Sequence, residues 1–331
     1  MEVWFFFDEG TTGREPQMSG EETERIYTRA PPKRVGRALA LLTKTYHGSR
    51  VTERVVSDVR LRRQSGIESL LVECRMGATV QDFYDDLSSD YHLIFEDWEA
   101  SMASQAAALR PILVRECGTT MPIRVLDCAC GIGTQALGLA RAGFRVTGTD
   151  LSPRAIERAD MEASTRSLDL QFQVADMLHL DVVAETEFDA VICMDNALPH
   201  LSCDEKLAAA AAQIRKKLRP GGIFVASTRD YDRLIQERPV VDGPRFFSDA
   251  GRRRIVFQLW DWIDERRYSF HLYVTRETPT GWRTQHGTTT YRAVLREELA
   301  TILESVGFVR VKWALPAETG FFQPLVVAVA G

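Results

Sequence analysis

IRVLDCACGIGTQALGLARAGFRVTGTD, residues 123–150, contains the segments around which we expect the rest of this chain to fold. The stretch begins with an apolar run suited to a buried parallel strand, and a glycine-containing turn follows it. Apolar residues then recur at helical spacing, and a second strand ends at Asp150. The stretch therefore predicts a β-α-β unit of a doubly wound sheet.

The turn of this unit has the features of a nucleoside site. Gly131 and Gly133 leave the backbone open, whereas a side chain would keep a nucleotide or nucleoside away from it. Asp150 follows roughly 20 positions later, where a carboxylate accepts hydrogen bonds from ribose hydroxyls. We predict that these residues bind the cofactor, together with Leu151.

Two cofactors fit this layout. Gly131-x-Gly133-x-x-Ala136 matches the fingerprint of NAD(P)-dependent oxidoreductases. Asp127, at the end of the first strand, favours a different cofactor, because its negative charge would face a diphosphate. S-adenosylmethionine carries a sulfonium and an ammonium, so we predict that cofactor, with Asp127 among its ligands. The oxidoreductase and a non-catalytic binding module remain the alternatives.

The bulk composition narrows the function further. The chain has 331 residues, is 45% hydrophobic and carries a formal charge of −5, which argues against a nucleic-acid partner. No apolar stretch approaches the roughly 18–20 residues that span a bilayer. Six cysteines without a secretory signal predict reduced thiols and a cytoplasmic location, and no second pair accompanies Cys128 and Cys130 to predict a metal site. We expect an enzyme that acts on a small-molecule substrate and has no membrane partner. A homo-oligomer is compatible with this expectation.

The first 75 residues differ from the remainder. The segment 25–63 is rich in arginine, and no regular strand and turn pattern follows it. We predict that 1–75 is a poorly ordered extension or lies outside the native domain, which then covers 76–331. A basic arm for an anionic partner is the alternative.

Aromatic residues from Thr79 onward recur at helical spacing and predict a helical segment before the first strand. Such residues are usually core. Tyr84, Tyr91 and Trp98 nevertheless carry polar groups that can contact a ligand, and we predict that they close over the cofactor.

Polar residues follow three later strands, at the sheet edge where doubly wound proteins bind ligands. Asp176 and Met177 follow a strand at 170–174, and we predict that Asp176 accepts from the adenine amino group unless it only caps a helix. A strand at 188–194 ends at Met194, which we assign to the cofactor site.

Asn196 and His200 follow that fourth strand, where they would lie nearest the reacting methyl group. Arg229 and Tyr231 follow a fifth strand at 223–227. An arginine there suits a substrate carboxylate, the alternative being a surface salt bridge with a neighbouring aspartate. We predict these four as the catalytic residues.

The segment 233–291 is longer than a simple loop, and its alternating pattern predicts antiparallel strands at 253–263, 268–276 and 284–291. Trp260, Trp262, Tyr268, Tyr273 and Tyr291 are candidates for lining the substrate pocket from this lid. A helix at 296–306 and strands at 308–315 and 325–330 complete the chain. The predicted fold is α/β, with a seven-stranded, mostly parallel sheet and an antiparallel lid inserted after strand 5.

Residues 84–331 resemble the glycine N-methyltransferase and glycine–sarcosine N-methyltransferase group of class I methyltransferases. The resemblance rests on VLDCACGIGTQALGLARAGFRVTGTD, FDAVICMDNALPHL, LRPGGIFVASTRDYD and YRAVLREELATILESVGF. It implies that S-adenosylmethionine is held by Ala129, Gly131, Asp150, Asp176 and Met177. It further implies that Asn196 and His200 lie at the reacting centre and that Arg229 and Tyr231 hold an amino acid's carboxylate.

The implied activity is N-methylation of an amine or amino acid of the glycine or sarcosine type, with O-methylation of a small metabolite as the alternative. Two departures concern the substrate side. Asp195 stands before Asn196 where that family often has a small residue, and the lid is the least similar part of the chain.

Overall fold

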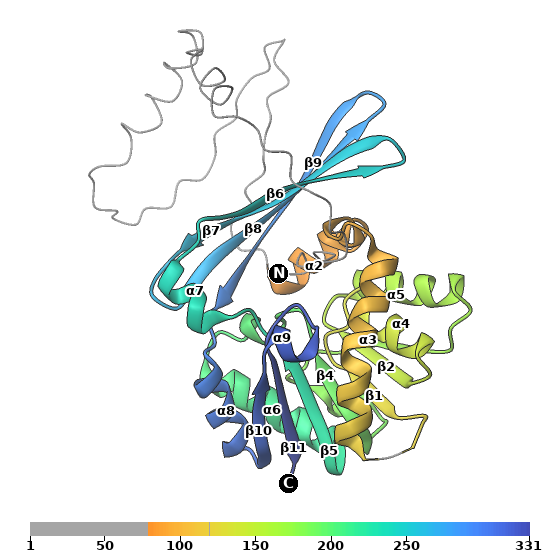
Figure 1. Ribbon diagram of the computed structural model, residues 1–331, viewed down its shortest axis with the longest axis vertical. Coiled ribbons are helices and arrows are strands. Elements are labelled where there is room, and N and C mark those ends of the chain that lie inside the picture. Colours follow the sequence, from red (N-terminus) through yellow and green to blue (C-terminus); the bar gives the residue numbers. More distant parts are fainter. Residues whose placement is uncertain (1–78, 119) are drawn as a thin grey trace, which may run out of the picture. The chain divides into compact units, whose positions relative to one another are not determined.

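The computed structural model describes residues 79–118 and 120–331, which belong to one compact unit (Figure 1). The predictions for 1–75 lie outside the described residues. Among the residues that are described, no helix is both long and apolar enough to cross a membrane.

The central sheet has seven strands in the order β10-β11-β5-β4-β1-β2-β3. The strands are β1 Arg124–Asp127, β2 Arg145–Asp150, β3 Gln171–Val174, β4 Phe188–Cys193, β5 Leu218–Ser227, β10 Phe308–Ala314 and β11 Leu325–Ala330. Neighbours among β1 to β5 are parallel, whereas β11 is antiparallel to both β5 and β10. The predicted doubly wound sheet with an antiparallel edge is confirmed.

Helices cover both faces of this sheet, because its central strands are apolar on both sides. Helices α3 Trp98–Cys117, α4 Thr134–Arg141 and α5 Pro153–Thr165 pack on one face, and α6 Asp204–Lys217 and α8 Arg296–Ser305 on the other. In β4, Ala190 and Ile192 join the first of these cores, while Val191 and Cys193 join the second. Side chains alternate between faces along a strand, so one apolar run supplies both cores.

The fifth strand corrects one prediction. The sequence predicts this strand at 223–227, but β5 already begins at Leu218, which pairs with Phe188. The register shifts before Ile223 pairs with Ala190, so the Pro-Gly-Gly segment forms an irregularity inside a longer strand.

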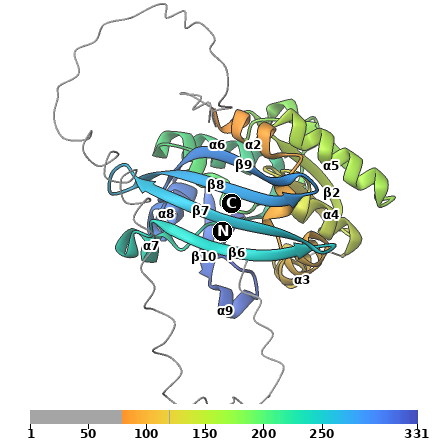
Figure 2. The ribbon, with the colours of Figure 1, turned by 90° about the horizontal axis from the view of Figure 1, so that it is seen from above.

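A second, antiparallel sheet follows β5, as predicted, and it spreads over the carboxyl edge of the central sheet (Figures 1 and 2). Its strands are β6 Val241–Asp249, β7 Arg252–Trp262, β8 Arg267–Thr278 and β9 Gly281–Arg292. The prediction lacked β6, and it also lacked the short helices α7 Tyr231–Glu237 and α9 Pro316–Thr319. This four-stranded sheet is the lid.

The segment before β1 joins the two sheets. Helix α2, Val80–Leu87, begins with Thr79, whose side chain accepts a hydrogen bond from the backbone of Asp82. The helix packs on β9, where Gly287 makes room for the ring of Phe83, because a Cβ at that glycine would lie 2.8 Å from the ring. Tyr84, the next residue of α2, is thereby held at the carboxyl edge of the central sheet.

Candidate active site

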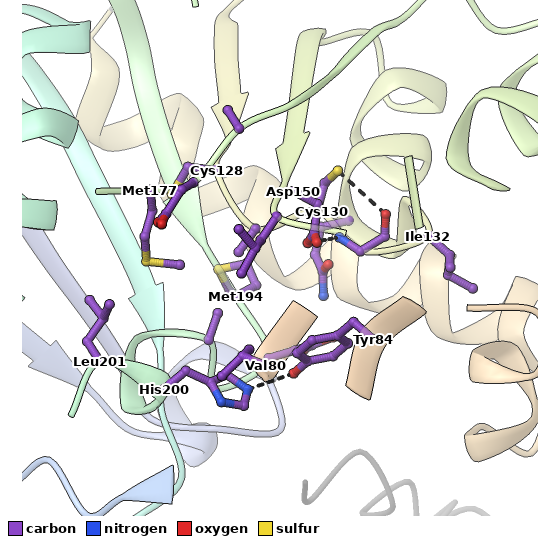
Figure 3. A pocket seen from close by; sticks show the side chains of 18 of the residues that line it. Val80, Tyr84, Cys128, Cys130, Ile132, Asp150, Met177, Met194, His200 and Leu201 are labelled. Atoms are coloured by element: carbon purple, nitrogen blue, oxygen red, sulfur yellow. Dashed lines mark hydrogen bonds between the residues drawn. The ribbon is translucent and has the colours of Figure 1, made fainter. Parts of the chain in front are cut away.

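A cavity of about 240 Å³ lies at the carboxyl ends of the parallel strands (Figure 3). The segments after β1, β2, β3 and β4 line it, and α2 closes it from the side of the lid. Ten of the predicted site residues are among its lining residues: Tyr84, Tyr91, Ala129, Gly131, Asp150, Leu151, Asp176, Met177, Met194 and His200.

Asp150 is held in place by the glycine turn. Gly131 has a left-handed φ of 52°, and its N–H donates to Oδ2 of Asp150 at 2.9 Å. Oδ1 accepts from the N–H of Ser152 at 2.9 Å. Burial raises the pKa of this carboxyl, while the backbone donors oppose that rise. The carboxylate is thus oriented at the cavity wall, where ribose hydroxyls can reach its remaining lone pairs.

Asp176 lines the cavity and is not the N-cap of a helix, since the next helical turn, Leu180–Val182, has His179 at that position. Its Oδ1 accepts from the N–H of Leu178 at 2.9 Å, and the side chain is half-buried. This local turn uses one oxygen and leaves the other as an acceptor.

Asp127 lies behind the cavity and does not line it. It is fully buried, and neither oxygen accepts a well-formed hydrogen bond from the described residues. Burial raises the pKa of Asp127 well above its usual value, the backbone N–H of Ala129 opposes that rise, and the charges of Asp195 and Asp150 add to it. A buried carboxylate without a partner is costly, which fits a cationic group bound nearby.

Two further predicted cofactor residues also lie outside the lining. Trp98 is buried and donates from Nε1 to Oγ1 of Thr134 at 2.9 Å. Thr134 does line the cavity, so Trp98 supports the wall from behind. Gly133 has φ 94° and is the N-cap of α4.

A smaller cavity of about 20 Å³ adjoins the first and reaches the lid. The two cavities share Tyr84, Tyr91 and Asp195 as lining residues. Arg229 and Gln323 line only the smaller one. The smaller cavity therefore meets the larger one beside the predicted catalytic residues, as expected of an acceptor site next to a donor site.

Arg229 is 3% exposed and enclosed by aromatic rings. Its guanidinium lies 4.5 Å from the ring centre of Trp260 and 5.0 Å from that of Tyr291, and it donates to the hydroxyl of Tyr268 at 2.6 Å. The surface salt bridge is not found, since the adjacent aspartates pair with Arg296 instead. Within 79–118 and 120–331, Arg229 has no carboxylate partner.

Asn196 and Tyr231 line neither cavity and instead position Arg229. Oδ1 of Asn196 accepts from the backbone N–H of Arg229 at 3.0 Å, and its Nδ2 donates to the hydroxyl of Tyr231 at 2.9 Å. That hydroxyl lies 2.9 Å from the hydroxyl of Tyr268. The structure brings all these predicted residues together, but it places Asn196 and Tyr231 one layer behind the cavities.

His200 lines the larger cavity beside Tyr84. The Tyr84 hydroxyl lies 2.9 Å from Nε2 of His200, and the imidazole packs on Tyr291 at 4.3 Å between ring centres. Burial lowers the pKa of His200 to about 3, and Arg229 adds to the effect. The ring is therefore neutral near pH 7.

Four of the five candidate lid aromatics share one face of the lid. Trp260, Tyr268 and Tyr291 are buried around Arg229. Trp262 pairs with Tyr268 on the same face and donates to the carbonyl of Pro239. Tyr273 lies on the other face and stacks on Phe257 with 4.6 Å between ring centres. Of the five, Tyr291 lines the smaller cavity.

Sequence reasoning assigned no role to two polar residues of the smaller cavity, Asp195 and Gln323. Asp195 stood only as a departure from the resembled family, although it lies two residues after the end of β4. Gln323 precedes β11 in a segment that carries no motif, and its buried Oε1 lacks a partner among the described residues. Only the fold brings that loop beside Arg229.

A sheet of this strand order, with its cavity at the carboxyl ends of β1 to β4, defines the class of Rossmann-like methyltransferases. Residues 125–222 match the family described as a methyltransferase domain. A glycine/sarcosine N-methyltransferase of Parasynechococcus marenigrum is 31% identical over 47% of this chain and 54% of its own length. A rat glycine N-methyltransferase is 36% identical over 48% of this chain and 58% of its own length.

Solved structures agree on the fold. DesVI of Streptomyces venezuelae has a TM-score of 0.62 at 20% identity and covers 74% of this chain and 98% of its own. An amino pentose methyltransferase from Micromonospora echinaspora, solved with SAM bound, has a TM-score of 0.58 at 21% identity, over 73% and 95% of the two chains.

The chain has the fold of class I S-adenosylmethionine-dependent methyltransferases, and its residues 125–222 match a methyltransferase domain. It spans about half the length of the curated relatives described above. S-adenosylmethionine is the cofactor of this class, and the bare turn at Gly131, the oriented Asp150 and the unpartnered Asp127 fit it.

Proposed function

We propose that this protein transfers a methyl group from S-adenosylmethionine to the nitrogen of a small amino acid of the glycine or sarcosine type. The observation that carries the proposal is Arg229, a buried guanidinium at the acceptor cavity without a carboxylate partner in the described part of the chain. A substrate carboxylate would supply that partner, with the forked geometry that arginine favours.

When bound, S-adenosylmethionine supplies a methyl group that is already activated by the sulfonium. The protein's own task is then to align the acceptor and to exclude water, and alignment can contribute about 7–11 kcal/mol. Arg229 would fix the carboxylate end of the acceptor, and Tyr84 and His200 would shape the junction of the two cavities.

A methyl-transfer assay on an acceptor panel tests the chemistry. The panel contains glycine, sarcosine, glycolate, ethylamine and an amino sugar, with labelled S-adenosylmethionine as donor. We expect transfer to glycine or sarcosine and little to ethylamine, which lacks the carboxylate. Preferred transfer to glycolate would show O-methylation, and preferred transfer to the amino sugar or to ethylamine would overturn the role of Arg229.

Substitution of Arg229 tests the residue assignment. Arg229→Ala should raise the apparent KM of the acceptor by about 100-fold, because a buried charge-assisted pair is worth about 1.5–3 kcal/mol. The affinity for S-adenosylhomocysteine should change less than about threefold. Arg229→Lys, which keeps the charge in the aromatic pocket, should give an intermediate KM. Arg253→Ala, an exposed lid arginine paired with Glu277, is the matched control and should leave both constants unchanged.

A further inference from the structure

Asp195 occupies the junction of the two cavities and has no role in the function proposed above. It lies two residues after the end of β4 and is a lining residue of both the larger and the smaller cavity. Its N–H donates to Oγ of Ser227 at 2.8 Å, at the end of the neighbouring strand β5. The carboxylate therefore lies between the site of the methyl donor and the site of the acceptor.

The backbone at this point is left-handed, a conformation that residues other than glycine, asparagine and aspartate rarely adopt. Asp195 has φ 54° and Asn196 has φ 68°, so two consecutive residues are left-handed. Aspartate and asparagine tolerate this conformation, and two hydrogen bonds to Ser227 fix it: the N–H of Asp195 donates to Oγ and the N–H of Asn196 to the carbonyl oxygen. This conformation directs the Asp195 side chain into the cavities while Asn196 turns back to hold Arg229.

The carboxylate of Asp195 has capacity to bind a ligand. Its Oδ1 is buried without a hydrogen-bond partner among the described residues. Burial raises the pKa of Asp195 to about 6, and the side chain of Gln135 opposes that rise. Titratable and charged groups line the same cavities or act on Asp195 electrostatically. Among the described residues these are Tyr84, Tyr91, Asp127, Cys128, Cys130, Asp150, Asp176, His200, Lys206, Arg229 and Tyr291.

We infer that Asp195 binds the acceptor's ammonium group and takes its proton before methyl transfer. This inference rests on the proposed function and adds a binding site for the nitrogen of the acceptor. Arg229 and Asp195 line the smaller cavity with opposite charges, which match the two charges of a zwitterionic amino acid. Arg229 binds the carboxylate end, and Asp195 binds the nitrogen on the side of the larger cavity.

Asp195 suits this task better than His200. The imidazole has a pKa lowered to about 3 by burial and by Arg229, so it is a very weak base, and its Nε2 is already hydrogen-bonded to Tyr84. A carboxylate whose pKa lies closer to neutral is ionised at pH 7.5 and still holds a proton well enough to act as a base.

The step balances without another reactant. The proton passes from the ammonium nitrogen to a carboxylate oxygen of Asp195. The freed lone pair forms the N–CH₃ bond, and the electron pair of the breaking S–CH₃ bond stays on sulfur, which becomes a neutral thioether. The proton leaves Asp195 for solvent when the product departs.

Calorimetry on the enzyme saturated with S-adenosylhomocysteine tests proton binding without turnover. Titration with glycine or sarcosine in two buffers of different ionisation enthalpy counts the protons released per acceptor bound. In the wild type at pH 7.5 we expect about zero, because the ammonium binds intact beside an ionised Asp195. In Asp195→Asn the neutral amine must bind instead, so we expect release of close to one proton and weaker binding.

Kinetics supply the second readout. Asp195→Asn should lower kcat by about 10²–10³-fold at pH 7.5, and its rate should keep rising with pH as free amine accumulates, whereas the wild type levels off above pH 6–7. Asp195→Gly, which suits the left-handed φ, should fold and show the same pH profile. Asp261→Asn, an exposed lid carboxylate, is the control and should behave as wild type.

The outcomes separate the two proposals. If the wild type neither binds nor methylates any amino acid, the proposed function fails and this inference with it. If the wild type methylates glycine or sarcosine but Asp195→Asn keeps the wild-type proton count and pH profile, the inference alone is overturned. A loss of S-adenosylhomocysteine affinity above tenfold in Asp195→Asn, with an unchanged proton count, would instead assign Asp195 to the donor and also overturn it.

Discussion

At the scale of single residues, the site gathers charges that the folded chain does not neutralise by itself. Asp127 and Asp195 are carboxylates with raised pKa values and unpartnered oxygens, and Arg229 is a buried cation without an ion pair among the described residues. Leaving such groups unpaired destabilises a protein. Their presence around two adjoining cavities therefore indicates that ligands complete the pairing.

Asp127→Asn should stabilise the ligand-free protein and weaken cofactor binding. Because burial raises the pKa of Asp127, the folded state holds its proton more tightly than the unfolded state does. The carboxyl is then protonated in both states below about pH 3.9, and its penalty grows as the pH rises towards the folded-state pKa. Thermal unfolding between pH 5 and 8 should show the advantage of the Asn variant increasing with pH.

The same variant should bind S-adenosylhomocysteine about tenfold more weakly, because the ammonium of the ligand loses the attraction of a nearby buried carboxylate. Equal stability of variant and wild type across the pH range, with equal affinity for this ligand, would remove Asp127 from the site.

At the scale of elements, most helices and strands were predictable because their apolar spacing matches their burial. The strand that was missed, β6, has Gly243-Pro244 within it and exposed side chains such as Phe246, so it lacks the alternation of a half-buried strand. It is the edge of the lid, and its pairing with β7 defines it. Such pairing is a tertiary property that a local pattern does not record.

The contact between α3 and α4 gives a test at this scale. Gly138 lies in α4, where an added Cβ would come 2.5 Å from the backbone oxygen of Met102 in α3. In a helix without close neighbours, alanine stabilises the fold by about 1 kcal/mol relative to glycine. Overpacking a close contact destabilises it by about 1–3 kcal/mol. Gly138→Ala should therefore lower the free energy of unfolding measured with urea by about 1–2 kcal/mol.

Ala208→Gly, at a half-buried position of α6, calibrates that measurement and should destabilise by about 0.5–1 kcal/mol through helix propensity alone. A stabilising Gly138→Ala would mean that the two helices are farther apart than this structure has them.

At the scale of the whole molecule, the cofactor cavity is built from segments far apart in the chain. The loops after four parallel strands form its floor and walls, and α2, held against β9, closes it. A ligand that contacts all of these segments binds only the folded state, so it should stabilise that state as one unit.

S-adenosylhomocysteine at 100 times its Kd should add about 2.7 kcal/mol of stability. For a domain of this size that corresponds to a rise in Tm of about 5–10 °C. NADH should leave Tm unchanged, and Asp150→Ala should reduce the shift. A rise with NADH but none with S-adenosylhomocysteine would favour the dinucleotide reading of Gly131 and Gly133.

The amino-acid sequence alone determined the parallel sheet, its antiparallel edge, the glycine turn and the acidic residues at the strand tips. These are local properties. The spacing of apolar residues distinguishes strands from helices, and the carboxyl ends of all parallel strands meet at one edge of the sheet. Tertiary structure alone decided that Asn196 lies behind Arg229, that Trp98 lies behind Thr134, and that Asp195 joins the two cavities. Those positions depend on how loops from different strands, the segment before β1 and the lid pack together. The residues in contact lie 33 and 36 positions apart in the first two cases, and a local sequence pattern does not record which distant residues meet.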